Sequence, residues 1–184
     1  MNIALDIDGV IIDFVRSFNT VVKKRLDYDL KYEDLYCHDI GQVLGIPKAD
    51  VNQLLHETLE NNHFELIDQA KESIDYLKDH HYVFLITGRD ESYRERTIDL
   101  LKEHEIHYEE LYFSRYLEKH HVDVHFDVFV EDSVEEAIGL SREGSTVLLM
   151  SHPWNVRTLN LKSLFKRVNN WKDIVKEIDR LSLK

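Results

Sequence analysis

Hydrophobic residues along the chain fall into short continuous runs separated by longer stretches of helical periodicity. The runs at 3–5, 82–86, 127–130 and 146–150 are rich in branched and aromatic side chains, which is typical of buried β-strands. A weaker run at 110–114 predicts a further strand. We therefore expect five strands spread along the whole chain.

The segments between these runs carry apolar residues at the three- and four-residue spacing of a helix. Phe14, Phe18 and Val22 show the pattern, which continues to Leu26 and predicts one amphipathic helix there. Further helices are expected at 49–61, 68–79, 91–104, 134–142 and 171–181.

Strands that alternate with helices predict right-handed βαβ connections and a parallel sheet with helices on both faces. The sequence therefore predicts an α/β protein built in three layers. The stretch 15–64 differs, because it is polar and helix-like and contains no convincing strand. We interpret it as a small helical cap inserted after the first strand, so that 1–14 and 65–184 form the core domain.

Composition narrows the class of protein. The chain has 184 residues, of which 43% are hydrophobic, enough for one buried core and a modest insertion. Its formal net charge of −12 would repel nucleic-acid polymers. A small phosphorylated metabolite is still an acceptable partner, because a metal ion and one or two cationic side chains can hold it locally.

Other features bear on location and assembly. No apolar run reaches membrane-spanning length, and the first residues lead straight into a strand, so neither a membrane span nor a signal peptide is expected. The single Cys37 excludes an intramolecular disulfide, which makes the cytoplasm the expected compartment. The sequence leaves open whether two copies form a homodimer.

Polar residues follow the predicted strands at the points where the strands end. Because the carboxyl ends of parallel strands meet at one edge of a sheet, where such proteins bind ligands, we expect these residues to converge. They are Asp6 and Asp8 after the first strand, Thr87, Gly88 and Arg89 after the second, Ser114 after the weak strand, and Glu131 and Asp132 after the next.

The two aspartates after the first strand need a compensating charge. Asp6 and Asp8 point the same way along an extended chain, so they repel each other unless a cation or hydrogen bonds intervene. Mg²⁺ prefers oxygen ligands, which could come from the side chains of Asp6 and Asp132 and from the main-chain carbonyl of Asp8. Glu131 would contact these ligands rather than the metal ion itself. Taken alone, the first pair is equally compatible with a solvated turn and the second with an acidic helix N-cap.

A phosphate monoester as substrate would use all of these groups. Its hydrolysis needs a nucleophile, a proton donor for the leaving oxygen and cations for the developing charge. Asp6 can attack phosphorus to form an aspartyl-phosphate, and Asp8 can protonate the leaving alkoxide and later deprotonate water. Thr87 and the backbone amides around Gly9 and Gly88 can hydrogen-bond the phosphate oxygens.

The phosphate also calls for a cationic side chain. Lys119 is the one lysine between Lys102 and Lys162, so elimination selects it. Arg115 could share or replace that task. The two tryptophans, Trp154 and Trp171, are expected to be packing residues.

The combination of motifs is more specific than any one of them. It comprises Asp6-Ile7-Asp8-Gly9-Val10, Thr87-Gly88-Arg89, Lys119 and Glu131-Asp132, each after or near a successive strand. Together they resemble the four motifs of the haloacid dehalogenase superfamily, and they span the core from Asp6 to Asp132. The resemblance implies a Rossmann-like phosphatase fold with an inserted cap.

Further segments support a narrower resemblance. They are the run from Asp6 to Phe14, Asn62-His63-Phe64-Glu65-Leu66, His152-Pro153-Trp154-Asn155 and Arg167-Val168-Asn169-Asn170-Trp171. These look like the 5'(3')-deoxyribonucleotidase family and its bacterial nucleotidase-like relatives. There the phenylalanine in the place of Phe14 lines the base pocket, so the resemblance implies Phe14 and Phe64 as substrate-binding residues, with Arg89 as a third candidate. The second motif of characterised members is of a Thr-Ser-Pro type, whereas Gly88 and Arg89 follow Thr87 here.

The combined prediction is a Mg²⁺-dependent phosphatase that acts on a small phosphate ester, preferably a nucleoside or deoxyribonucleoside 5'-monophosphate. The segment Glu131-Asp132-Ser133 also resembles the fourth motif of β-phosphoglucomutase-like members, so a sugar-phosphate phosphatase or phosphomutase is the alternative enzyme. A binding or regulatory protein that keeps the fold without the chemistry is a third hypothesis. Both aspartates and the lysine are present, which favours an enzyme.

Overall fold

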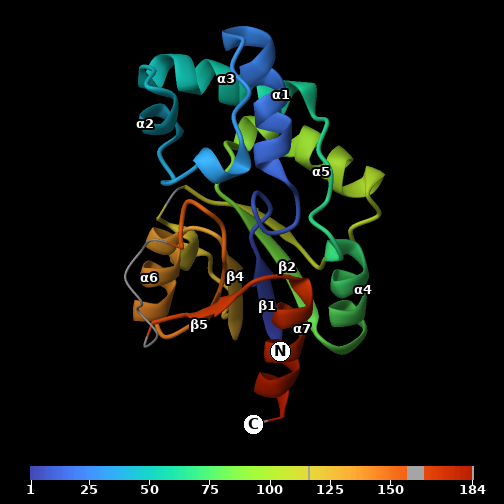
Figure 1. The fold of residues 1–184 in the computed structure, drawn as a ribbon. Helices are drawn as coiled ribbons and strands as arrows, with labels where there is room; N and C mark the ends of the chain where they lie inside the picture. The colour runs from blue at the N-terminus through green and yellow to red at the C-terminus, as the bar shows by residue number, and fades with distance from the viewer. Residues whose placement is uncertain (116, 157–163, 184) are drawn as a thin grey trace.

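Six parallel strands form one sheet in the computed structural model, which describes residues 1–115, 117–156 and 164–183. The strands lie in the order β3-β2-β1-β4-β5-β6, with β1 at the centre between β2 and β4 (Figure 1). Their bounds are β1 Asn2–Leu5, β2 Tyr82–Thr87, β3 Leu111–Phe113, β4 Val128–Glu131, β5 Thr146–Met150 and β6 Lys166–Val168.

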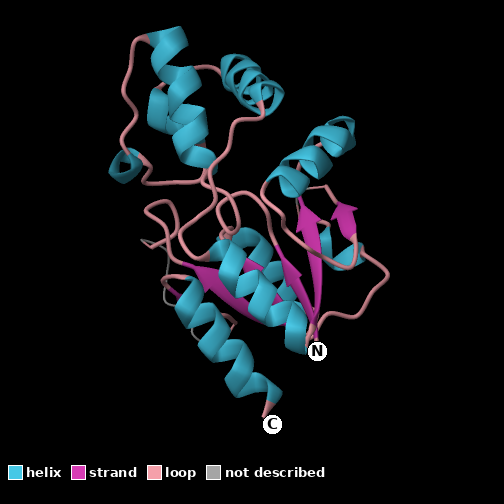
Figure 2. Cartoon of the chain, turned by 90° about the vertical axis from the view of Figure 1, so that its right-hand side faces the viewer, coloured by secondary structure: helices cyan, strands magenta, loops and turns pink. Residues whose placement is uncertain are grey.

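Alternate residues of the central strands face opposite sides of the sheet, as the pleat of a strand requires. Leu5 and Val130 belong to the apolar cluster on one face, whereas Ala4 and Phe129 belong to the cluster on the other. Helices α4 (Ala70–His80), α5 (Arg94–Glu103) and α7 (Trp171–Ser182) contribute to the first cluster, and α6 (Val134–Arg142) to the second. The predicted three-layer α/β fold with a parallel sheet is confirmed (Figure 2).

Three helices stand at the carboxyl ends of the central strands, in the connection between β1 and α4 (Figure 1). They are α1 (Phe14–Leu26), α2 (Ile40–Leu44) and α3 (Lys48–Asn61). Phe18, Val22 and Leu54 form part of a separate apolar cluster in this segment. The segment therefore has a small core of its own above the sheet.

Local signals explain where α1 and α2 begin and end. The Asp13 side chain accepts a hydrogen bond from the backbone of Arg16 and caps the start of α1. Gly45 adopts the left-handed conformation that ends α2, which glycine does without strain. Three short 3₁₀ turns complete the described elements: η1 (Tyr32–Asp34), η2 (Glu91–Tyr93) and η3 (Lys119–His121).

The elements expected from the sequence are present with bounds shifted by at most a few residues, and α1 and β5 lie where they were predicted. Among the described elements, β6, α2, η1 and η3 were not predicted. Strand β6, at the edge of the sheet, and the two turns have three residues each and α2 has five, so none is long enough to show a periodicity. Within the described part of the chain, no helix combines the length and the apolar character needed to cross a lipid bilayer.

Candidate active site

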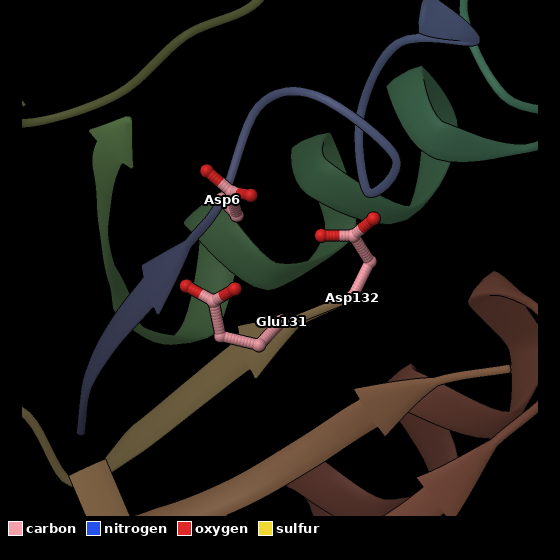
Figure 3. Close-up of side chains that lie close together, drawn as sticks. All are labelled: Asp6, Glu131 and Asp132. Atoms are coloured by element: carbon pink, nitrogen blue, oxygen red, sulfur yellow. The ribbon is translucent and has the colours of Figure 1, made fainter. Parts of the chain in front are cut away.

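Three acidic side chains meet at the carboxyl ends of the two central strands β1 and β4 (Figure 3). Asp6 follows β1 directly, Glu131 is the last residue of β4, and Asp132 comes next. One carboxylate oxygen of each residue lies within 4.8 Å of the others. The backbone N–H of Asp6 donates to the carbonyl of Val130 over 3.0 Å, which continues the pairing of the two strands into the site.

Lys119 lies against two members of this cluster. Its Nζ is 2.9 Å from Oδ1 of Asp6 and 2.5 Å from Oε1 of Glu131. Burial acts to lower the pKa of Lys119, but the charges of Asp6 and Glu131 outweigh it and raise that pKa, so the ammonium stays charged. Arg115, the sequence alternative, is exposed and does not line the cavity at this site.

The environment of the acidic cluster disfavours so many negative charges. Burial raises the pKa of Asp6 and of Glu131, although the neighbouring Lys119 opposes the shift. Burial and then the charge of Asp6 raise the pKa of Asp132 to about 8. The site as a whole has four carboxyl groups and two cationic side chains, Lys119 and Arg89. The acids are Asp6, Asp8, Glu131 and Asp132. When all six groups are ionised, two negative charges are left in excess.

These residues fit a divalent cation. Oε2 of Glu131 is buried and has no hydrogen-bond partner among the described residues, which is costly for a carboxylate oxygen unless something else contacts it. The cluster offers oxygen donors alone, the ligand type that hard divalent cations take. Asp6, Glu131 and Asp132 could therefore hold a metal ion.

The second aspartate of the motif points to a different partner. Both oxygens of Asp8 accept hydrogen bonds from Arg89, each 2.8 Å long, in a bidentate pair. The remaining arm of Arg89 donates to Oγ1 of Thr97 over 3.1 Å, and its guanidinium lies 5.0 Å from the centre of the Phe64 ring. The Asp8 carboxylate is thus paired with Arg89 and does not belong to the cluster of Asp6, Glu131 and Asp132.

A cavity of about 2040 Å³ opens between the sheet edge and the helical segment, and the acidic cluster forms part of its wall. Most of the residues singled out from the sequence line it: Asp6, Asp8, Gly9, Phe14, Gly88, Arg89, Lys119, Glu131 and Asp132. Four do not: Thr87, Phe64, Ser114 and Arg115. Thr87 is fully buried, where its Oγ1 accepts the backbone N–H of Arg89, and Phe64 is buried in the core.

Phe14 borders the cavity but is already packed against other rings. Its ring centre lies 6.0 Å from that of Phe18 and 5.9 Å from that of Phe64, with an angle of 21° between the planes in both pairs. These offset stacks link the helical segment to the core. Much of the Phe14 ring is therefore used for packing.

The family assignment follows from sequence comparison. Residues 1–183 match the family model described as 5' nucleotidase, deoxy (pyrimidine), cytosolic type C protein. The chain belongs to this nucleotidase family. A nucleotidase of Clostridium acetobutylicum is 28% identical over 191 residues, which cover 98% of this chain and 95% of that protein.

Solved structures support the fold of this nucleotidase family member. A haloacid dehalogenase-like hydrolase of Streptococcus pneumoniae superposes with a TM-score of 0.69 at 15% identity, covering 96% of this chain and 97% of that one. A hydrolase of the same superfamily from Deinococcus radiodurans, solved with bound phosphate and sodium, gives a TM-score of 0.68 at 14% identity, covering 99% and 96%. The haloacid dehalogenase resemblance stated from the motifs is confirmed.

The candidate site also contains residues that the motifs did not assign to it. Trp154 was expected to be a packing residue, yet its indole N–H donates to Oδ2 of Asp132 over 2.9 Å. His152 and Tyr32 line the cavity beside it. The available signal was position, because His152-Pro153-Trp154-Asn155 follows β5 at the same edge of the sheet as the recognised motifs.

Gly9 is required by a close approach between two loops of this site. Its φ is +79°, and a Cβ built on it would lie 2.5 Å from Oδ2 of Asp132. We predict that Gly9→Ala lowers the free energy of unfolding by more than the roughly 1 kcal/mol expected for backbone strain alone, because Asp132 must also move. Urea denaturation in metal-free buffer measures this change.

Gly144→Ala is the matched control. Gly144 also has a positive φ, of +95°, but a Cβ there would meet nothing within 4 Å. Equal losses of stability in the two variants would contradict the close approach as the reason for a glycine at position 9.

Proposed function

We propose that this chain is a Mg²⁺-dependent phosphatase that hydrolyses a nucleoside or deoxyribonucleoside 5'-monophosphate through an aspartyl-phosphate on Asp6. Membership of the nucleotidase family supports the reaction class. The observation that carries the proposal is the buried group of Asp6, Glu131, Asp132 and Lys119 in the wall of one large cavity.

Asp6 is the proposed nucleophile. Oδ1 of Asp6 is held by Lys119, so Oδ2 is the oxygen we assign to the attack on phosphorus. The P–O bond of the ester then breaks, and the ammonium of Lys119 stabilises the negative charge of the phosphoryl group. A bound Mg²⁺ would neutralise phosphoryl oxygens and favour the ionised carboxylates of Asp6 and Asp132, with Glu131 nearby.

Asp8 is the proposed proton donor and acceptor. It gives a proton to the leaving alkoxide and later takes one from the water that attacks the aspartyl-phosphate, which releases phosphate and restores Asp6. Both oxygens of Asp8 are bonded to Arg89, so at least one must turn from the guanidinium toward the leaving group. We therefore propose that Arg89 positions Asp8 rather than contacting the substrate.

The phosphate and nucleoside parts of the substrate have separate places in the proposal. Backbone groups near Gly9 and Gly88 border the cavity and are our candidates for binding phosphate oxygens, while the buried Thr87 supports the turn that carries Arg89. Small-molecule pockets are commonly about 300–1,000 Å³, so a cavity of about 2040 Å³ has room for a nucleoside as well. Phe14 in its wall is the proposed base contact, and the helical segment 15–64 is the proposed cap.

The first test is phosphate release from p-nitrophenyl phosphate and from nucleoside 5'-monophosphates, with and without Mg²⁺. We expect wild-type turnover that needs the metal, and we expect Asp6→Asn to abolish it while the fold is retained, because the change removes the nucleophile at constant shape. Circular dichroism establishes the fold of the variant.

Each other outcome of this assay identifies a different hypothesis. Turnover of sugar phosphates in preference to nucleotides would favour the sugar-phosphate alternative. No turnover of any ester by the wild type would favour a binding protein. Activity of Asp6→Asn close to that of wild type would remove the covalent mechanism.

A second test concerns Asp8. Asp8→Asn should slow the release of a poor leaving group, such as a nucleoside, much more than the release of p-nitrophenol, because only the former needs a proton in the transition state. The measurement is kcat for both substrates in wild type and variant. An equal loss for both leaving groups would show that Asp8 acts on the metal site instead of on the leaving oxygen.

A further inference from the structure

Two stacked rings contact the two loops of the acidic site, namely the loop after β1 that carries Gly9 and the loop after β4 that carries Asp132. The imidazole of His152 and the indole of Trp154 lie 4.2 Å apart between centres with 6° between their planes. Both residues follow β5 and line the cavity. Neither belongs to the set of residues assigned above to nucleophilic attack, proton transfer or metal binding.

Trp154 contacts a carboxylate of the acidic cluster. Its Nε1 can only donate, and it donates to Oδ2 of Asp132 over 2.9 Å. A donor on one oxygen fixes the orientation of the whole carboxylate and hence the position of the oxygen that faces Asp6 and Glu131. Metal ligands in proteins are commonly oriented by such outer partners.

His152 contacts the loop that carries the two aspartates. Its Nε2 lies 2.6 Å from the carbonyl oxygen of Gly9. A carbonyl cannot donate, so Nε2 carries the proton and Nδ1 of the neutral ring accepts the hydroxyl proton of Tyr32. Tyr32 belongs to the helical segment, so His152 joins that segment to the Gly9 loop.

Further hydrogen bonds fix the backbone segment that carries His152 and Trp154. The side-chain amide of Asn155 donates to the carbonyls of Asp132 and Met150, over 2.8 Å and 2.7 Å. Arg167, from β6, in turn donates to the side chain and the carbonyl of Asn155. The segment that carries the two rings is therefore tied to the ends of β4, β5 and β6.

We propose that His152 and Trp154 are positioning residues that hold the Gly9 loop and the Asp132 carboxylate in register, so that the acidic cluster is pre-organised for a divalent cation. The two loops already approach so closely that a Cβ on Gly9 would overlap Asp132. A small shift of either loop would therefore move a ligand oxygen. The inference rests on the proposed function, because the cation is the one proposed there.

Trp154→Phe tests the indole contact. Phenylalanine keeps a ring to stack on His152 and removes the N–H that orients Asp132. We expect the affinity for Mg²⁺, measured by isothermal titration calorimetry without substrate, to fall about tenfold. We also expect kcat at subsaturating Mg²⁺ to fall while KM for the substrate stays near the wild-type value.

Tyr112→Phe is the matched control. The hydroxyl of Tyr112, on β3, donates to Oε2 of Glu110 over 2.6 Å, and neither residue lines the cavity, so this variant also loses one ring donor to a carboxylate but away from the site. We expect it to leave the affinity for Mg²⁺ near the wild-type value. This contrast separates the loss of any ring hydrogen bond from a loss of metal-site geometry.

His152 provides a second pair of variants in case Trp154→Phe folds poorly. His152→Gln can still donate to the Gly9 carbonyl, whereas His152→Leu is of similar size and cannot. We expect weaker Mg²⁺ binding in His152→Leu and a substantial recovery in His152→Gln.

Two results would overturn the inference while the proposed function stands. They are a Mg²⁺ affinity of Trp154→Phe equal to that of wild type, and equal affinities of His152→Leu and His152→Gln that match the wild-type value. A wild-type protein that neither binds Mg²⁺ nor releases phosphate would instead overturn the proposed function, and this inference with it.

Discussion

Burial of three carboxyl groups close together is the constraint on which this site depends. Removing a charge from water is costly unless another charge compensates it, and the acids of Asp6, Glu131 and Asp132 lie within 4.8 Å of one another. Lys119 compensates part of this charge through its contacts with Asp6 and Glu131. The raised pKa values of the three carboxyl groups express the remainder, which a divalent cation would balance.

The fold brings about this arrangement by simple means. β1 and β4 are neighbouring parallel strands, so residues that follow them in the sequence necessarily share one edge of the sheet. Gly9 lets the first loop approach Asp132, and the residues after β5 supply donors to both loops. The helices between β1 and α4 then enclose the other side of the cavity. The sheet, the loops at its edge and the helical segment thus all contribute to one site.

Sequence periodicity predicted the sheet, and strand ends predicted that Asp6 and Asp132 would meet, because both follow from local pattern and parallel topology. Lys119 was selected by elimination, with Arg115 as the alternative. The pairing of Arg89 with Asp8 was not predictable in this way, since it depends on how two side chains that are far apart in the sequence are oriented in the fold. The role of Trp154 was missed for the same reason, because an indole has one polar atom and its partner is 22 residues away. Phe64 and Thr87 were predicted to contact the substrate, whereas both are buried, and burial is a tertiary property that their place in the sequence does not reveal.

The proposed metal centre is tested most directly by the effect of Mg²⁺ on the melting temperature of wild type and of Asp132→Asn at pH 8. Burial and the charge of Asp6 disfavour the ionised Asp132, so the metal-free variant should be at least as stable as the metal-free wild type. Mg²⁺ should then raise the melting temperature of the wild type and leave that of the variant nearly unchanged. Equal stabilisation of both proteins by Mg²⁺, or no stabilisation of the wild type, would contradict a metal centre at these carboxylates.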